Sequence, residues 1–147
     1  LLADGKTIKI KPQGYSMYPL FVPGRDEACI EHTDFSSLKR GDVILYRRDK
    51  SILVLHRIWK ITNNSLYMVG DNQTEIEGPL RADQVRGKLT AFVHNGKFVN
   101  VKNPIYRFTS TLWLFFPSLF LETYVVFTQK TTLIIYIIFS FASSRLC

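Results

Sequence analysis

Gly14-Tyr15-Ser16-Met17-Tyr18-Pro19-Leu20 is a short segment in which glycine and proline flank a serine. His56 follows further along the chain, and then Asp71, which stands between a glycine and an asparagine. A serine hydroxyl barely ionises near neutral pH, so it needs a neighbouring base to become a nucleophile, and that base needs a partner to hold its tautomer. The sequence therefore offers Ser16, His56 and Asp71 as the catalytic parts of a hydrolytic site.

Later segments extend this pattern. They are Arg40-Gly41-Asp42-Val43-Ile44-Leu45-Tyr46, Val54-Leu55-His56-Arg57-Ile58 and Gly70-Asp71-Asn72. Together with the serine segment, and in this order, they resemble the sequence boxes of the type I signal peptidases. The resemblance continues loosely to about Val93 and does not reach the C-terminal part of the chain.

The residue at the base position divides this family. Most bacterial signal peptidases have a lysine there, whereas His56 resembles the endoplasmic-reticulum and archaeal enzymes and their spore-former relatives, within the wider S24/S26 clan. Lys60 is four residues further along the same strand, too far to replace His56 by a simple exchange. The resemblance implies a serine endopeptidase that processes a peptide or preprotein, exported or membrane-tethered, and that uses no cofactor.

The serine segment has a defined part in this interpretation. Ser16 attacks the peptide carbonyl, and His56 takes its proton and later protonates the leaving amine. The backbone N–H of Ser16 and a neighbouring donor stabilise the oxyanion. Met17 and Pro19 shape the turn and contact the substrate, although packing in the core explains both residues equally well.

The acid that orients His56 has several candidates. Asp71 is the first choice because it occupies the Gly-Asp-Asn box, and its alternative role is to cap a turn. Histidine-type relatives carry a second acid a few residues later, where this chain has Glu75 and Glu77. Asp83 is a further option.

Short segments separated by turn residues indicate a mostly β domain, in the form of a small, partly open barrel. Residues 70–82 are expected to form an irregular acidic loop, and Asn95-Gly96 a tight turn. Val54, His56 and Ile58 share one strand face, so His56 is partly desolvated and neutral, as a general base must be. Strands are expected at 7–11, 27–31, 43–47, 52–61, 66–69, 85–93 and 97–101.

The composition of the chain changes near residue 104. The net charge is +7, and residues 105–147 contain eleven of the twenty aromatic residues but only three basic residues and one acid. This shift predicts a catalytic β-domain over 1–104 and a hydrophobic, helical tail over 105–147. The basic residues are scattered among acids without a DNA-binding motif, so no nucleic-acid partner is expected. Two cysteines and three unclustered histidines predict no metal site.

Residues 111–142 predict association with a membrane, which we take to be a bacterial cytoplasmic membrane. A spanning helix needs about twenty mostly apolar residues, and 121–142 reaches that length only by including Glu122 and Lys130. One spanning helix, two helices in the interface and a helix pair packed on the β-domain are all compatible with this pattern. The thirteen residues before Gly14 leave no room for the N-terminal anchor that is usual in the family.

Two other functions are compatible with the sequence. A non-catalytic peptide-binding module with the same fold would account for the short chain and the imperfect acid box. Self-cleavage, as in the repressor-type members of the clan, would need an Ala-Gly or Cys-Gly site, and the sequence contains neither.

Overall fold

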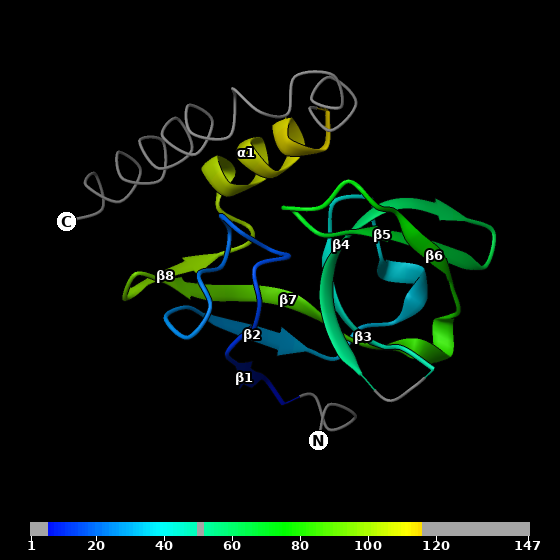
Figure 1. Ribbon diagram of the computed structural model, residues 1–147, viewed down its shortest axis with the longest axis horizontal. Helices are drawn as coiled ribbons and strands as arrows, with labels where there is room; N and C mark the ends of the chain where they lie inside the picture. Colours follow the sequence, from blue (N-terminus) through cyan, green and yellow to red (C-terminus); the bar gives the residue numbers. More distant parts are fainter. Residues whose placement is uncertain (1–5, 50–51, 116–147) are drawn as a thin grey trace.

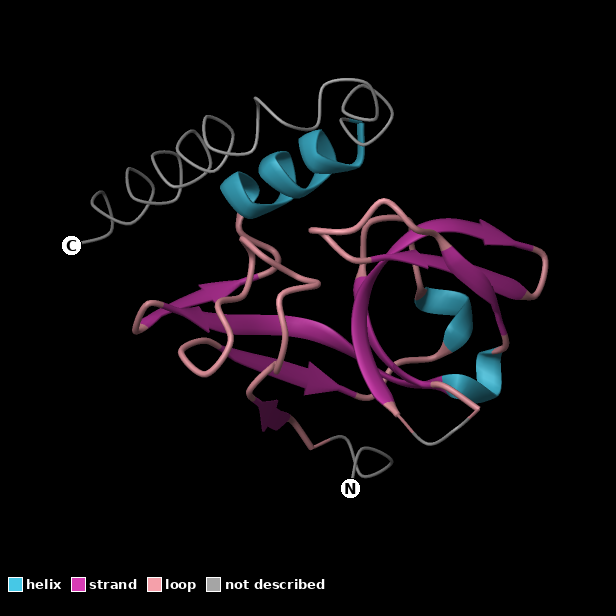
Figure 2. Cartoon of the chain, in the orientation of Figure 1, coloured by secondary structure: helices cyan, strands magenta, loops and turns pink. Residues whose placement is uncertain are grey.

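The computed structural model describes residues 6–49 and 52–115, and within them the chain is mostly β, which confirms the predicted fold class (Figure 2). In this part of the chain, antiparallel strands form one sheet, and the helix α1 (Pro104–Phe115) follows the last strand. Single-turn 3₁₀ helices occur at Phe35–Ser37 and Ala82–Gln84. The strands are β1 (Ile8–Ile10), β2 (Glu27–Glu31), β3 (Val43–Arg47), β4 (Leu53–Thr62), β5 (Ser65–Val69), β6 (Glu77–Leu80), β7 (Val85–His94) and β8 (Lys97–Asn100).

The sheet curls into a barrel that stays partly open. The strands are ordered β1-β2-β7-β3-β4-β5-β6, with β8 paired to β7 beside this row. β7 links two halves of the domain, because its first residues pair with β3 and its later residues pair with β2 and β8. In Figure 1, β3 to β6 curve around the 3₁₀ turn at 35–37, while β1, β2, β7 and β8 lie on the other side of the domain.

Alternating residues of β3 enter two separate cores. Val43 and Leu45 pack with the serine segment and β7, in what we call the serine-side core. Ile44 and Tyr46 point the other way, into a barrel core that also contains Ile58, Leu66, Met68 and Leu80. A strand buried on both faces needs a continuous apolar run, and β3 has one.

The strand predictions succeed where the local signals are strong. β2 and β3 have the predicted bounds, β7 and β8 differ from the prediction by one residue at one end, and β4 differs by one residue at each end. The turn between β7 and β8 has positive φ at Asn95 (49°) and Gly96 (78°), as a type I′ turn requires. Apolar alternation between clear turn residues is therefore sufficient to locate most of this sheet.

The expectation of an irregular loop over 70–82 was wrong in its second half. Glu77–Leu80 form β6, which pairs antiparallel with β5 through Leu66↔Leu80 and Met68↔Glu77. The strand contains Gly78 and Pro79, which normally interrupt strands, and a proline is tolerated here because β6 is at the end of the sheet. This strand matters for function because it brings Glu77 to the barrel.

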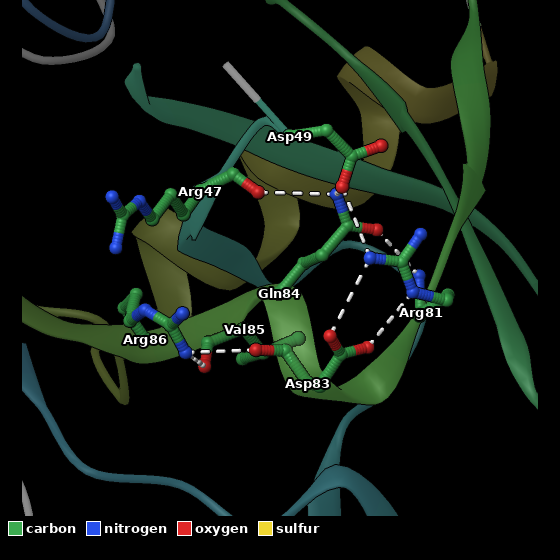
Figure 3. A network of polar contacts seen from close by, with 7 residues as sticks. All are labelled: Arg47, Asp49, Arg81, Asp83, Gln84, Val85 and Arg86. Atoms are coloured by element: carbon green, nitrogen blue, oxygen red, sulfur yellow. Dashed lines mark hydrogen bonds and ion pairs between the residues drawn. The ribbon is translucent and has the colours of Figure 1, made fainter. Parts of the chain in front are cut away.

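A polar network fastens the turn after β6 to the end of β3 (Figure 3). The Arg81 guanidinium lies 3.0 Å from carboxylate oxygens of both Asp49 and Asp83. The Gln84 side chain donates to the Arg47 carbonyl at 3.1 Å and accepts from the Arg81 N–H at 2.9 Å. The ion pairs are exposed and contribute little stability, so the buried glutamine is the main link.

Helix α1 packs across the β-domain next to the serine segment (Figure 1). Tyr106 belongs to the serine-side core, where its ring lies 5.3 Å from that of Phe92, and Leu114 is buried over Gly41. Phe108, on the outer side of the helix, is 65% exposed. The first residues of the predicted tail are thus helical and contact the domain.

Most of the predicted tail, residues 116–147, lies outside the described residues. Among the residues that the structure describes, no helix is both long enough and apolar enough to cross a bilayer. The division into 1–104 and 105–147 and the membrane role of 111–142 remain predictions.

Candidate active site

The serine segment forms a tight turn anchored in the core. The Phe21 N–H donates to the Met17 carbonyl at 2.9 Å, and the Tyr18 N–H donates to the Tyr15 carbonyl at 3.1 Å. Met17 and Phe21 are each 1% exposed, so their side chains anchor the turn in the core. Ser16, at the start of the turn, is half-buried. The packing of both residues holds the serine in one position.

Met17 and Pro19 lie in different surroundings. Met17 is buried in the serine-side core, as the packing role considered for it requires, and its contact with the substrate remains a prediction. Pro19 is half-buried and lines a small cavity under α1, together with Arg57, Asp71 and Trp113. A substrate contact at Pro19 remains a prediction.

The serine turn lies directly against the Gly-Asp-Asn segment. The Asn72 N–H donates to the Ser16 carbonyl at 2.8 Å. A Cβ at Gly70 would lie 2.6 Å from the same carbonyl oxygen, closer than any side chain allows. Only glycine lets the two segments approach this closely, so the fold brings together motifs that are distant in the sequence.

His56 lies on β4, which pairs with the strand that leads into Gly70. β4 pairs with β5 through Ile58↔Met68 and Arg57↔Val69, and one further step of that register sets Gly70 opposite His56. Residues directly opposite each other in a sheet point to the same face. A side chain at Gly70 would therefore point to the same face as His56, and the Ser16 carbonyl takes the place of that side chain. No hydrogen bond joins Ser16 to His56 within the described residues; such bonds are often long in the absence of substrate.

The imidazole of His56 is buried in the barrel core. The residue is 4% exposed, and its Nδ1 lies 3.1 Å from the Tyr46 hydroxyl. Burial lowers the pKa of His56 from its ordinary value, and the Arg48 charge lowers it further, while the charges of Glu77 and Asp71 act in the opposite direction. The predicted desolvation of this histidine is therefore present, and it favours the neutral form.

Glu77 is the acid nearest to His56 among the residues proposed from the sequence. Its carboxylate accepts from the Tyr46 hydroxyl at 2.7 Å and receives two hydrogen bonds from Arg48, one of them at 2.6 Å. The Arg48 hydrogen bonds hold the pKa of Glu77 below its ordinary value, against the opposing effect of burial. The His56 Nδ1 and the Glu77 carboxylate are 4.0 Å apart.

Asp71 has a different partner. Both of its carboxylate oxygens accept hydrogen bonds from Arg57 at 2.7 Å, and the two side chains are only 2% and 4% exposed. Arg57 also donates to the Gly41 carbonyl at 2.9 Å and to the Ser110 hydroxyl of α1. The structure thus places Asp71 in a buried ion pair under the helix, rather than in contact with His56.

The remaining sequence candidates lie elsewhere. Glu75 is exposed, Asp83 belongs to the Arg81 network of Figure 3, and Lys60 is exposed near the end of β4. Among the described residues, no group of three His, Cys, Asp or Glu side chains is arranged to hold a metal ion. Tyr46, near the end of β3, and Arg48, directly after β3, were missed as site residues, although their spacing of two residues is the available signal.

Comparison with known proteins gives one informative similarity. Signal peptidase I W of Bacillus subtilis is 34% identical to this chain over 93 residues, which are 60% of this chain and 48% of that protein. The chain therefore spans about half the length of the curated relative it matches. No family model and no solved structure matches the chain. The similarity supports a signal peptidase I-like relationship.

Proposed function

We propose that this chain is a serine endopeptidase of the type I signal peptidase kind, with Ser16 as nucleophile and His56 as general base. The observation that carries the proposal is the contact of the Ser16 turn with Gly70 and Asn72, which directly follow the strand that pairs with the strand of the buried His56. The similarity to a signal peptidase supports the same activity.

The proposed reaction has two steps. The Ser16 hydroxyl attacks the scissile carbonyl as its proton passes to Nε2 of His56, and His56 then protonates the leaving amine. Water, activated by the same imidazole, hydrolyses the acyl-enzyme and releases Ser16. The backbone N–H of Ser16, with a neighbouring donor, is proposed to stabilise the oxyanion in both steps.

For the acidic member of the site, we propose Glu77 in place of Asp71. Glu77 shares the Tyr46 hydroxyl with His56, whereas both oxygens of Asp71 are occupied by Arg57. Asp71 then has a structural role, since it neutralises a buried arginine that supports both the Gly41 turn and α1.

The proposed substrate is a peptide or preprotein held at a membrane. The apolar outer residues of α1 are exposed: Ile105 and Phe108 precede the segment predicted to bind the bilayer, and Leu112 lies at its start. Membrane attachment through 111–142 would keep the site close to a tethered substrate.

A cleavage assay tests the proposal. Detergent-solubilised full-length protein is expected to cut a membrane-tethered peptide carrying an Ala-x-Ala site, with the fragments identified by mass. Ser16→Ala should bind the same peptide and leave it intact, and Ser36→Ala, at an exposed serine on a 3₁₀ turn, should cleave normally. A folded wild-type protein that binds the peptide without cutting it would favour the peptide-binding module instead.

The pH dependence of cleavage provides a second expectation. A general base must be neutral, so kcat/KM should rise with pH through the pKa of His56 in the free enzyme. Because burial lowers that pKa from 6.5, the acidic limb should lie below pH 6.5 and activity should persist in mildly acidic buffer. The measurement is kcat/KM between about pH 4.5 and 8.5, roughly two units either side of the ordinary pKa of histidine, on a substrate without titratable groups. An acidic limb above pH 6.5 would contradict the assigned base.

A further inference from the structure

The Tyr46 hydroxyl lies between the histidine and the glutamate of the proposed site. It is 3.1 Å from the His56 Nδ1 and 2.7 Å from a Glu77 carboxylate oxygen. All three side chains are on the barrel-core face, because Ile44 pairs with His56 on β4 and Glu77 pairs with Met68 on β5. Tyr46 itself is fully buried.

Glu77 does not reach His56 directly. The 4.0 Å between the His56 Nδ1 and the Glu77 oxygen exceeds the length of a hydrogen bond. The carboxylate therefore influences the orientation of the imidazole through the hydroxyl that both groups share. This differs from a triad in which the acid accepts the histidine N–H itself.

The direction of each hydrogen bond follows from the donors available. A carboxylate paired with Arg48 is ionised and can only accept, so the single proton of the Tyr46 hydroxyl goes to Glu77. The Tyr46 oxygen is then left to accept, and the only proton that His56 can give it is the one on Nδ1. The tautomer with Nδ1–H has its lone pair on Nε2, which is the atom a general base uses.

We propose that Tyr46 is a positioning residue, whose hydroxyl, oriented by Glu77, accepts the Nδ1–H of His56 and holds the imidazole with Nε2 ready to take the serine proton. The proposal rests on the proposed function for the role of His56. During the reaction the serine proton moves to Nε2, Nδ1 keeps its own proton, and Tyr46 keeps the proton it shares with Glu77. The resulting imidazolium is stabilised by the nearby carboxylate charge.

The charged groups around the imidazole are compatible with this arrangement. Glu77 from β6 and Asp71 from the loop after β5 favour the imidazolium, and Arg48, directly after β3, opposes it. Burial raises the pKa of Tyr46 far above its ordinary value, so the phenol stays protonated throughout the range in which the histidine titrates. Tyr46 therefore orients the base without exchanging a proton with it.

The test combines spectroscopy and kinetics on the full chain in detergent. ¹⁵N correlation spectra of the histidine rings report which nitrogen carries the proton, and His56→Gln assigns the His56 signals. Wild-type protein is expected to show His56 as the Nδ1–H tautomer, and Tyr46→Phe should shift it to a mixture or to Nε2–H. In the same variant kcat should fall by roughly 10- to 100-fold, the loss that is typical when a partner that orients a metal-ligating histidine is removed, with KM little changed.

Tyr67→Phe is the matched control. Tyr67 is a half-buried tyrosine on β5 whose hydroxyl has no hydrogen-bond partner among the described residues. In Tyr67→Phe, neither the tautomer signal of His56 nor kcat should therefore change. A wild-type His56 in the Nε2–H form, or an unchanged tautomer and kcat in Tyr46→Phe, would overturn the proposal. A tautomer change in Tyr46→Phe with no cleavage by wild type would support the positioning by Tyr46 and count only against the proposed function.

Discussion

Removing the hydroxyl of Ser16, the imidazole of His56 or both at once is expected to lower kcat/KM by the same factor, roughly 10³-fold or more. The two groups act on one event, the transfer of the serine proton as the carbonyl is attacked. Once either partner is absent that event is lost, so removing the second costs little more. The double variant Ser16→Ala/His56→Ala should therefore stay within about threefold of each single variant.

The measurement is kcat/KM for the tethered peptide with all three variants, after circular dichroism has established that each is folded. His32→Ala is the matched control for the histidine, because His32 is exposed and lies outside the barrel core. Multiplied losses in the double variant would mean that Ser16 and His56 act independently, and the dyad would have to be abandoned. Residual activity in all variants would reflect substrate binding and the oxyanion donors.

The contrast between Asp71 and Glu77 shows why the sequence alone could not choose the acid. The β4–β5 hairpin begins with Thr62↔Ser65, Ile61↔Leu66 and Lys60↔Tyr67, and an unbroken register would continue to His56↔Asp71. The structure has an irregularity between Ile58 and Lys60, after which the pairs are Ile58↔Met68 and Arg57↔Val69. Trp59 is the extra residue.

A shift of one residue exchanges the two faces of a strand. Continued past the last pair, Arg57↔Val69, the shifted register would set Gly70 opposite His56 and put Asp71 on the face of Arg57, with which it is hydrogen-bonded. The sequence predicts the hairpin from Asn63-Asn64, but no local pattern identifies the irregularity at Trp59. The sequence therefore predicts which residues form each strand, but it does not predict which residues of two neighbouring strands face each other.

β6 was missed for a related reason. Gly78-Pro79 is a turn signal in isolation, and only pairing with β5 makes it a strand. The same pairing brings Glu77 beside Tyr46, so missing the strand and missing the Tyr46 contact have one cause. In contrast, the Ser16 turn and the burial of His56 could be predicted, because they depend on residues close together in the sequence.

Asp71→Asn is expected to destabilise the protein by about 3–5 kcal/mol, because it leaves Arg57 charged, buried and without its counterion. Arg57 is 2% exposed and donates to both oxygens of Asp71, and an amide oxygen can replace only one of these contacts without restoring the charge. Against a typical domain stability of about 5–15 kcal/mol this is a large loss. Urea unfolding, followed by circular dichroism, measures it.

Asp83→Asn is the matched control, since Asp83 forms an exposed ion pair with Arg81 and its loss should change stability by less than about 1 kcal/mol. Kinetics then separate the two acids. Folded Asp71→Asn should keep kcat within about tenfold of wild type, whereas Glu77→Gln, which leaves the Arg57 pair intact, should lower kcat more than it lowers stability. The reverse pattern, with a stable but inactive Asp71→Asn, is what an orienting acid at position 71 would produce, and it would return Asp71 to the catalytic role that its sequence box suggests.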